Sequence, residues 1–97
     1  MTAQLSWQLR QNILLLQGDL NRETLLPLWQ QSGALLVGIH CINVAQLQRV
    51  DSSGLALLVH LQQRSHQHGT TLTISGISEQ LATLVKLYNL QQIISIY

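Results

Sequence analysis

The sequence contains few of the residues that carry charge, stack as rings or form covalent cross-links. Of its 97 residues only 9% are charged and 4% aromatic, phenylalanine is absent, and there is one cysteine and one proline. The single cysteine, Cys41, cannot form an internal disulfide. The net charge is +1 and the five basic residues are well separated, so no basic stripe is present that could neutralise a nucleic-acid backbone. We therefore expect no nucleic-acid partner.

Long apolar runs are also missing. The longest nearly uninterrupted one, ALLVGIHCI at residues 34–42, is about half as long as a membrane-spanning helix requires. No cluster of basic residues is present that would bind an anionic membrane surface. The first ten residues, MTAQLSWQLR, lack the basic region and apolar run of a signal peptide. These absences favour a cytoplasmic protein without direct membrane insertion.

Hydrophobic residues make up 46% of the chain, and glutamine, with fourteen copies, is its main polar residue. A chain of 97 residues is long enough for a single domain, residues 1–97, with a modest core. A surface with so little charge repels a partner only weakly, so we expect part of it to be covered when the protein functions. A glutamine-rich monomer is the alternative, and composition does not separate the two.

Hydrophobic periodicity predicts an α/β domain. The predicted strands are residues 5–10, 13–17, 39–44, 71–75 and 93–97. The first predicted helix is capped by Asn21 or, as the better candidate, Thr24, and ends near Gln31. The second runs from Ser52 to about His68, where Gly69 ends it. The third is capped by Ser78 and has Leu81, Leu84, Val85 and Tyr88 at helical spacing. This order indicates a mixed sheet of four or five strands with helices packed mainly on one face.

A strand-to-helix corner is predicted at Asp51-Ser52-Ser53-Gly54, and it holds one of only four acidic residues. A helix N-terminus has unsatisfied N–H groups and a partial positive charge. Asp51 or Ser52 can cap those donors, which stabilises a helix by roughly 1 kcal/mol. The alternative is that a hydroxyl of the corner accepts a phosphate, which the helix end would stabilise. The residues alone leave both interpretations open.

The helix predicted after the corner begins with an unusually apolar stretch, LALLVHL at residues 55–61. A surface helix is normally apolar on one stripe only, so this start indicates burial on two sides, by the sheet behind and by a partner in front. The alternative is complete coverage by neighbouring helices of the same domain. From Gln62 the sequence, QQRSHQHG, becomes polar, as an exposed helix end would be.

The stretch Asp51-Ser52-Ser53-Gly54-Leu55, between a strand and an apolar helix, resembles the signature of STAS domains (sulfate transporter and anti-sigma factor antagonist). The predicted order of elements over the whole chain is also similar to theirs. The resemblance implies a STAS fold. In the antagonist branch the hydroxyl directly after the aspartate is phosphorylated, which corresponds to Ser52, with Ser53 as the less favoured neighbour.

Within the STAS domains, the segments LLPLW at residues 25–29, RVDSSGLALLVHL at 49–61 and LVKLYNL at 84–90 resemble the small STAS subunit of the Mla phospholipid-transport ABC complexes of Gram-negative bacteria. This resemblance implies a non-catalytic subunit, peripheral at the inner membrane, that supports outer-membrane lipid asymmetry. It also implies that the chain docks on an MlaF-like ATPase subunit, and through it on MlaE-like permease and MlaD-like subunits, with Ser52 in the docking surface.

The pair Ser52-Ser53 departs from the Asp-Thr-Gly-Gly motif of that branch and is closer to the sigma-pathway antagonists. An anti-sigma factor antagonist switched by serine phosphorylation is therefore the alternative function. A STAS-like domain that binds a small ligand by itself is the least supported, because no glycine-rich loop or basic cluster marks a pocket.

The predicted partner-binding or phospho-acceptor residues are Asp51, Ser52, Ser53, Gly54 and Leu55. Further interface candidates are Leu58, Trp29, Lys86, Leu87 and Tyr88. Trp29 and Tyr88 qualify because large aromatic side chains dominate interface hot spots. Their helical spacing with leucines also fits core positions.

The sequence gives no support for a metal site, a cofactor or catalysis. His60, His66 and His68 are spaced i, i+6 and i+8, which does not place them on one helix face, whereas two ligands on a helix are typically spaced i, i+4. His40 and Cys41 alternate on a strand, and Cys41 is expected in the core. The G-x-S-x-G nucleophile elbow is absent as well.

Overall fold

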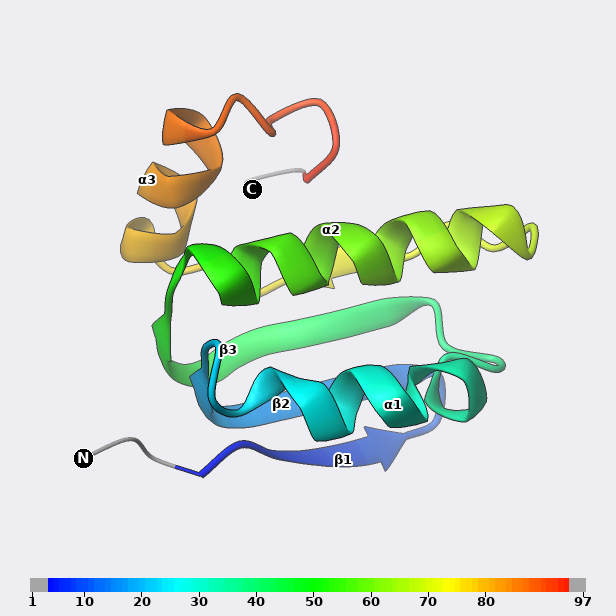
Figure 1. Cartoon of the computed structure of the whole chain (residues 1–97). Helices are drawn as coiled ribbons and strands as arrows, with labels where there is room; N and C mark the ends of the chain where they lie inside the picture. Colours follow the sequence, from blue (N-terminus) through cyan, green and yellow to red (C-terminus); the bar gives the residue numbers. More distant parts are fainter. Residues whose placement is uncertain (1–3, 95–97) are drawn as a thin grey trace.

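The computed structural model describes residues 4–94, which fold into one mixed sheet and three helices. In chain order the elements are β1 (Ser6–Arg10), β2 (Ile13–Leu20), α1 (Leu25–Leu35), β3 (Cys41–Val50), α2 (Ser52–Gln67), β4 (Thr73–Ser75) and α3 (Glu79–Leu87). The strands lie in the order β1-β2-β3-β4; β1 is antiparallel to β2 and the other neighbours are parallel (Figure 1). The predicted mixed α/β sheet is confirmed.

Strands β1 and β2 form the predicted hairpin. Its turn contains Gln11 at a φ of +56°, and the antiparallel register pairs Trp7 with Leu16. Directly paired residues point to the same face of a sheet, so the half-buried Trp7 lies on the same side as the fully buried Leu16. This alternation gives the hairpin one apolar face on which the helices pack.

The two central strands are longer than predicted. β2 continues past Gln17 to Leu20, and β3 continues past residue 44 to Val50. The parallel pairing of these strands extends to Leu20 opposite Val50, with irregularities in register along the way. Residues 45–50 are half-buried or exposed, so the hydrophobic pattern gave little signal there. The pairing with β2 is what makes this segment a strand, and it delivers the chain to the corner at Asp51.

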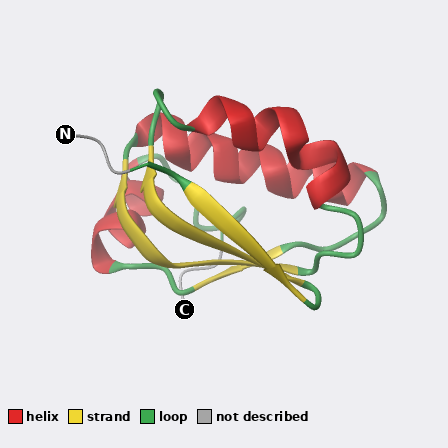
Figure 2. Ribbon diagram, turned by 90° about the horizontal axis from the view of Figure 1, so that it is seen from below, coloured by secondary structure: helices red, strands yellow, loops and turns green. Residues whose placement is uncertain are grey.

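Helices α1 and α2 run side by side in the same direction over one face of the sheet (Figures 1 and 2). The core lies between these helices and the sheet, and α3 closes it beside α2. Every element except the edge strands supplies a side chain that is at most 1% exposed, among them Leu14, Leu28, Ile42, Leu58 and Val85. None of the described helices is long and apolar enough to cross a membrane.

The start of α1 differs in detail from the prediction. Thr24 occupies the N-cap position, but its hydroxyl donates to the carbonyl of Asp19 at 2.8 Å and does not cap the helix amides. The side-chain oxygen of Asn21 instead accepts the amide of Thr24 at 3.2 Å. α1 also continues to Leu35, beyond the predicted end near Gln31. Gly33 therefore lies within α1.

The other predicted helix ends are confirmed. Ser78 caps α3, because its hydroxyl accepts the amide of Leu81 at 3.1 Å. Gly69 follows the C-cap of α2 with a φ of +80°, a conformation that glycine adopts without a steric penalty.

The last predicted strand, residues 93–97, is wrong where it can be compared. Ile93 and Ile94 follow a turn, and the amide of Ile94 donates to the carbonyl of Leu90 at 2.8 Å. The side chain of Ile94 is fully buried in the core, so the alternation in the sequence reflects burial without strand pairing. Residues 95–97 of the predicted strand lie outside the described residues.

Candidate functional site

The predicted corner lies where β3 ends and α2 begins. Asp51 has extended backbone angles, φ −96° and ψ −175°, and its Oδ1 accepts the amide of Gly54 at 2.8 Å. Its carbonyl accepts the amide of Leu55 at 2.9 Å, which is the first hydrogen bond of the helix. Asp51 is thus the N-cap of α2, and the helix start does not depend on the hydroxyls of the two serines.

The two serines are the exposed part of the corner. Ser52 is exposed and Ser53 half-buried, and within residues 4–94 no group forms a hydrogen bond with either hydroxyl. The amides of both residues precede the first intrahelical hydrogen bond, so they belong to the unsatisfied, electropositive end of the helix. The corner therefore offers a partner two hydroxyl groups in a weakly positive field.

Gly54, Leu55 and Leu58 were expected at the contact surface, and the structure corrects this expectation. Leu55 is 2% exposed and Leu58 is fully buried, both within the core of this chain. Gly54 is buried against β2, where an added Cβ would run into the carbonyl oxygen of Leu20. These three residues support the corner from inside, and a partner cannot touch the side chains of the two leucines in this fold.

The apolar start of α2 is covered mostly by the chain itself. The sheet, α1 and α3 cover Leu55, Leu57, Leu58 and Leu61, as the alternative of coverage by the domain's own elements predicted. From the start of α2 to His60 the exposed residues are Ser52, Ala56 and His60, at spacing i, i+4 and i+8, which places them in one line along the helix. Ala56 was not predicted at this surface, and His60 was considered only as a metal ligand. Their helical spacing from Ser52 was a partial signal, but it does not show which face of the helix the rest of the chain leaves uncovered.

A shallow groove of about 430 Å³ runs beside this line, between the first halves of α1 and α2. We call it the α1–α2 groove; its lining residues are Leu25, Trp29, Ser53, Ala56, Leu57 and His60. Trp29 is half-buried, and its ring meets the imidazole of His60 edge-on, with centroids 6.2 Å apart and planes at 62°. Trp29 is therefore both a core-packing residue and part of an accessible apolar wall.

The other side of the corner is polar. Asn21, Arg22, Glu23, Asp51 and Ser53 line an open hollow of about 280 Å³. Ser53 borders both this hollow and the α1–α2 groove, so it is more central than the sequence indicated. The surface around the corner consequently has an apolar side and a charged side.

The predicted patch at Lys86, Leu87 and Tyr88 is exposed on α3. Leu87 is 70% and Tyr88 55% exposed, which are unusually high values for side chains of this size. The start of α3, with Ser78 and Leu81, lies against the end of β3 next to the corner, whereas this patch is at the opposite end of the helix. It is therefore a separate candidate surface.

The histidine, cysteine and acidic side chains of the described residues do not gather at one site. No group of three histidine, cysteine, aspartate or glutamate residues within residues 4–94 is arranged to hold a metal ion. Cys41 is half-buried, and its Sγ lies 3.2 Å from the hydroxyl of Ser75. His60 lies against Trp29 and lines the α1–α2 groove. We find no arrangement in the described part of the chain that indicates catalysis.

The family model and the relatives that match this chain carry the same name. Residues 3–95 match the family model described as "Mlab, STAS domain". The chain is 41% identical over 90 residues to the "Intermembrane phospholipid transport system binding protein MlaB" of Escherichia coli (strain K12), with 93% of both chains covered. It is 35% identical over 96 residues to the protein of the same name from Haemophilus influenzae, with 89% of this chain and 91% of the relative covered.

Proposed function

The chain belongs to the MlaB family of STAS domains, and from this membership we propose that it is a non-catalytic subunit of an intermembrane phospholipid transport system. In this role it binds the ATPase subunit of the ABC-type transporter through the corner of Ser52 and Ser53 and the adjoining α1–α2 groove. Through the ATPase it is held at the cytoplasmic side of the inner membrane, next to the permease and the MlaD-like subunit.

The observation that carries this proposal is the exposed hydroxyl of Ser52 at the start of α2, directly beside an apolar groove. Small residues at Ser52, Ser53 and Ala56 let a partner backbone approach closely. Trp29 offers a large aromatic surface at low entropic cost, which is typical of interface hot spots. An apolar side chain of the ATPase that fills the groove would bury these surfaces together.

The charged hollow on the other side of the corner can set the orientation of the complex. Arg22 and Glu23 carry opposite charges near Asp51, so this rim favours a partner with a complementary pattern. Such rim contacts contribute specificity and association rate more than affinity. The affinity would come mainly from the apolar groove.

Substitution of Ser52 tests the proposal. Ser52→Asp places a carboxylate at the first position of α2, where it favours the helix but becomes an unpaired charge under a docked partner. We expect the dissociation constant of the purified chain and its ATPase subunit to rise at least about tenfold, equivalent to ~1.4 kcal/mol. Biolayer interferometry with the ATPase immobilised measures it.

Gln63→Glu is the matched control, because it adds the same charge at an exposed position about three turns further along α2. It should leave the dissociation constant unchanged, and thermal unfolding should show both variants folded. Equal affinity of Ser52→Asp and wild type would remove the corner from the interface. Absence of binding by the wild-type chain would refute the ATPase as partner.

A phosphorylation switch is the second candidate function, and the exposure of Ser52 at an electropositive helix end supports it. An anti-sigma antagonist of this kind would accept one phosphate on Ser52 from a partner kinase and then release that partner. Intact mass of the chain isolated from its own bacterium, compared with Ser52→Ala, tests this. A uniformly unmodified chain that co-purifies with an ABC ATPase would contradict the switch.

A further inference from the structure

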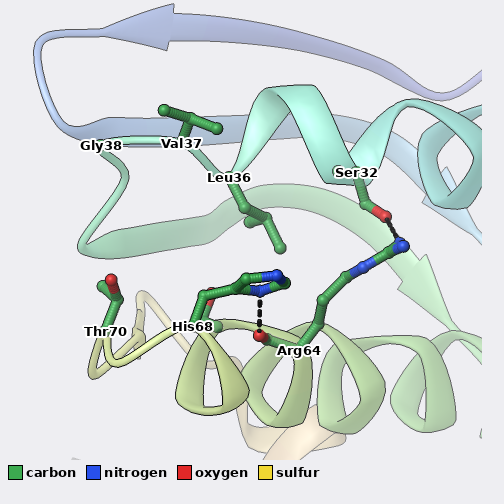
Figure 3. A pocket seen from close by; sticks show the side chains of 9 residues that line it. Ser32, Leu36, Val37, Gly38, Arg64, His68 and Thr70 are labelled. Atoms are coloured by element: carbon green, nitrogen blue, oxygen red, sulfur yellow. Dashed lines mark hydrogen bonds between the residues drawn. The ribbon is translucent and has the colours of Figure 1, made fainter.

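A further cavity, of about 290 Å³, lies between the C-terminal ends of α1 and α2 (Figure 3), far along both helices from the Ser52 corner. Its wall includes Ser32, Leu36, Val37, Arg64, Ser65 and His68. The proposed docking of the ATPase uses none of these residues. Docking of the ATPase therefore does not account for this cavity.

Arg64 supplies the charge of this cavity, and two contacts hold its guanidinium in place. Nη1 donates to the hydroxyl of Ser32 at 2.7 Å (Figure 3), and Cζ lies 4.8 Å from the centroid of the Trp29 ring. No carboxylate of the described residues forms an ion pair with it. The guanidinium has five N–H donors and uses only some of them here, so a positive group held in a fixed orientation remains available to an anion.

Ser65 adds a donor that the protein leaves unused. Its side chain is 4% exposed, and its Oγ has no hydrogen-bond partner within residues 4–94. Buried hydroxyls in folded proteins are nearly always paired, because an unpaired one costs free energy. Ser32, by contrast, is satisfied: its hydroxyl accepts from Arg64 and donates to the carbonyl of Trp29 at 2.7 Å. Ser65 lines the cavity, but its Oγ has almost no exposed surface, so the unpaired hydroxyl would donate to a bound group after its side chain rotates toward the cavity.

The position at two helix C-termini opposes an anion less strongly here than free helix ends would. Free carbonyls at such ends repel negative charge. The carbonyl of Ser65 accepts the amides of both His68 and Thr70, and that of Ser32 accepts the amide of Leu36, each at 2.9–3.0 Å. The carbonyl of Arg64 lies 2.9 Å from Nδ1 of His68, which then donates to it. Hydrogen bonding of these carbonyls weakens the repulsion, and the guanidinium supplies the positive charge that an anion would contact.

We propose that this cavity binds a small oxyanion, the phosphate or carboxylate group of a compact molecule, with Arg64 as counter-charge and Ser65 as hydrogen-bond donor. The volume is at the lower end of the roughly 300–1,000 Å³ that is typical of ligand pockets. The side chain of Leu36 points into the cavity and gives part of the wall an apolar character that suits a short hydrocarbon substituent (Figure 3). Methyl phosphate and propionate represent the two chemistries.

Titration of the full chain with each probe tests the site by two-dimensional amide NMR, with sodium chloride keeping the ionic strength constant. We expect saturable shifts of the amides around Ser65 and His68 with at least one probe. In Arg64→Gln the affinity should fall at least tenfold. Arg10→Gln removes the same charge from the exposed edge strand β1 and should bind as the wild type does. The probe that saturates identifies the preferred oxyanion.

Ser65→Ala separates binding from folding, because Arg64→Gln also removes contacts with Ser32 and Trp29. Removing an unpaired buried hydroxyl should leave the melting temperature unchanged or higher, while the oxyanion affinity falls at least threefold. Shifts that stay linear with both probes would overturn the proposal. So would saturable binding that both Arg64→Gln and Ser65→Ala leave unaltered.

Discussion

Gly54 shows how one residue ties the corner to the fold. It lies in the first turn of α2 against the backbone of Leu20, and an added Cβ would run into that carbonyl oxygen. We expect Gly54→Ala to lower the free energy of unfolding by about 1–3 kcal/mol, the usual cost of overpacking a well-packed site. Urea denaturation followed by circular dichroism measures it.

Gly33 provides the contrast for this substitution, because it is also helical but exposed. The nearest atom to its added Cβ is Nη2 of Arg64 at 4.0 Å, an ordinary contact distance. Gly33→Ala should therefore stabilise the chain by about 0.5–1 kcal/mol through helix propensity. If the two variants had equal stability, the close approach at Gly54 would not constrain the corner.

Asp51 makes a different contribution, through its side-chain cap. Its Oδ1 accepts the amide of Gly54 at 2.8 Å, so Asp51→Ala leaves that donor without its partner. We expect a loss of about 1 kcal/mol, whereas Asp51→Asn keeps a capping oxygen and should retain most of the stability. Equal losses in the two variants by urea denaturation would show that the carboxylate acts through its charge and not through the cap.

Helix α2 shows which features of an element a sequence reveals. Its predicted span, 52 to about 68, agrees closely with Ser52–Gln67, because Asp51 and Gly69 provide clear capping signals. The apolar start revealed that the helix is covered on more than one side. It did not reveal that the chain itself supplies the cover, since α1 and α3 pack there only through tertiary contacts. The exposed line of Ser52, Ala56 and His60 could therefore not be assigned from periodicity alone.

The strands also differ in whether local sequence or tertiary pairing determines them. The hairpin of β1 and β2 was predictable because both its alternation and its turn are local. The second half of β3 was not, because residues 45–50 are a strand only through pairing with β2. The expected strand at residues 93–97 failed for the converse reason. Its alternating hydrophobicity is satisfied at Ile94 by burial in the core, after a turn that the sequence did not signal.

Ala56 tests whether the outward line of α2 belongs to the interface. It is exposed and lines the α1–α2 groove, so Ala56→Arg fills the groove with a long charged side chain without entering the core. Stability should change by no more than about 0.5 kcal/mol, as is usual for surface substitutions. Affinity for the ATPase should fall at least about tenfold, or ~1.4 kcal/mol.

Gln63→Arg, exposed on the same helix, serves as control in the same binding assay. Unimpaired binding by Ala56→Arg would place the ATPase elsewhere, with the α3 patch of Lys86, Leu87 and Tyr88 as the next surface to test.

The molecule as a whole places two different surfaces along one pair of helices. The first halves of α1 and α2 form the α1–α2 groove beside Ser52, and their last turns enclose the cavity of Arg64. Trp29 connects the two, because its ring contacts His60 in the groove and the guanidinium of Arg64 at the cavity. A change in the position of this ring therefore acts on both sites. Oxyanion binding and ATPase docking would then be coupled through it, and each would change the affinity of the other by the same factor.

Trp29→Ala tests this connection. We expect it to reduce both the affinity for the ATPase and the affinity for the oxyanion probe, because the groove loses its aromatic wall and Arg64 loses the ring on which it rests. Stability should also fall, by about 2 kcal/mol, since the side chain is half-buried. Trp7→Ala is the matched control: this half-buried tryptophan lies on β1 and lines neither site, so its loss should lower stability but leave both affinities unchanged. Unfolding in urea gives the stabilities, interferometry the ATPase affinity and NMR titration the oxyanion affinity. A Trp29→Ala variant that loses only one of the two affinities would show that the sites work independently.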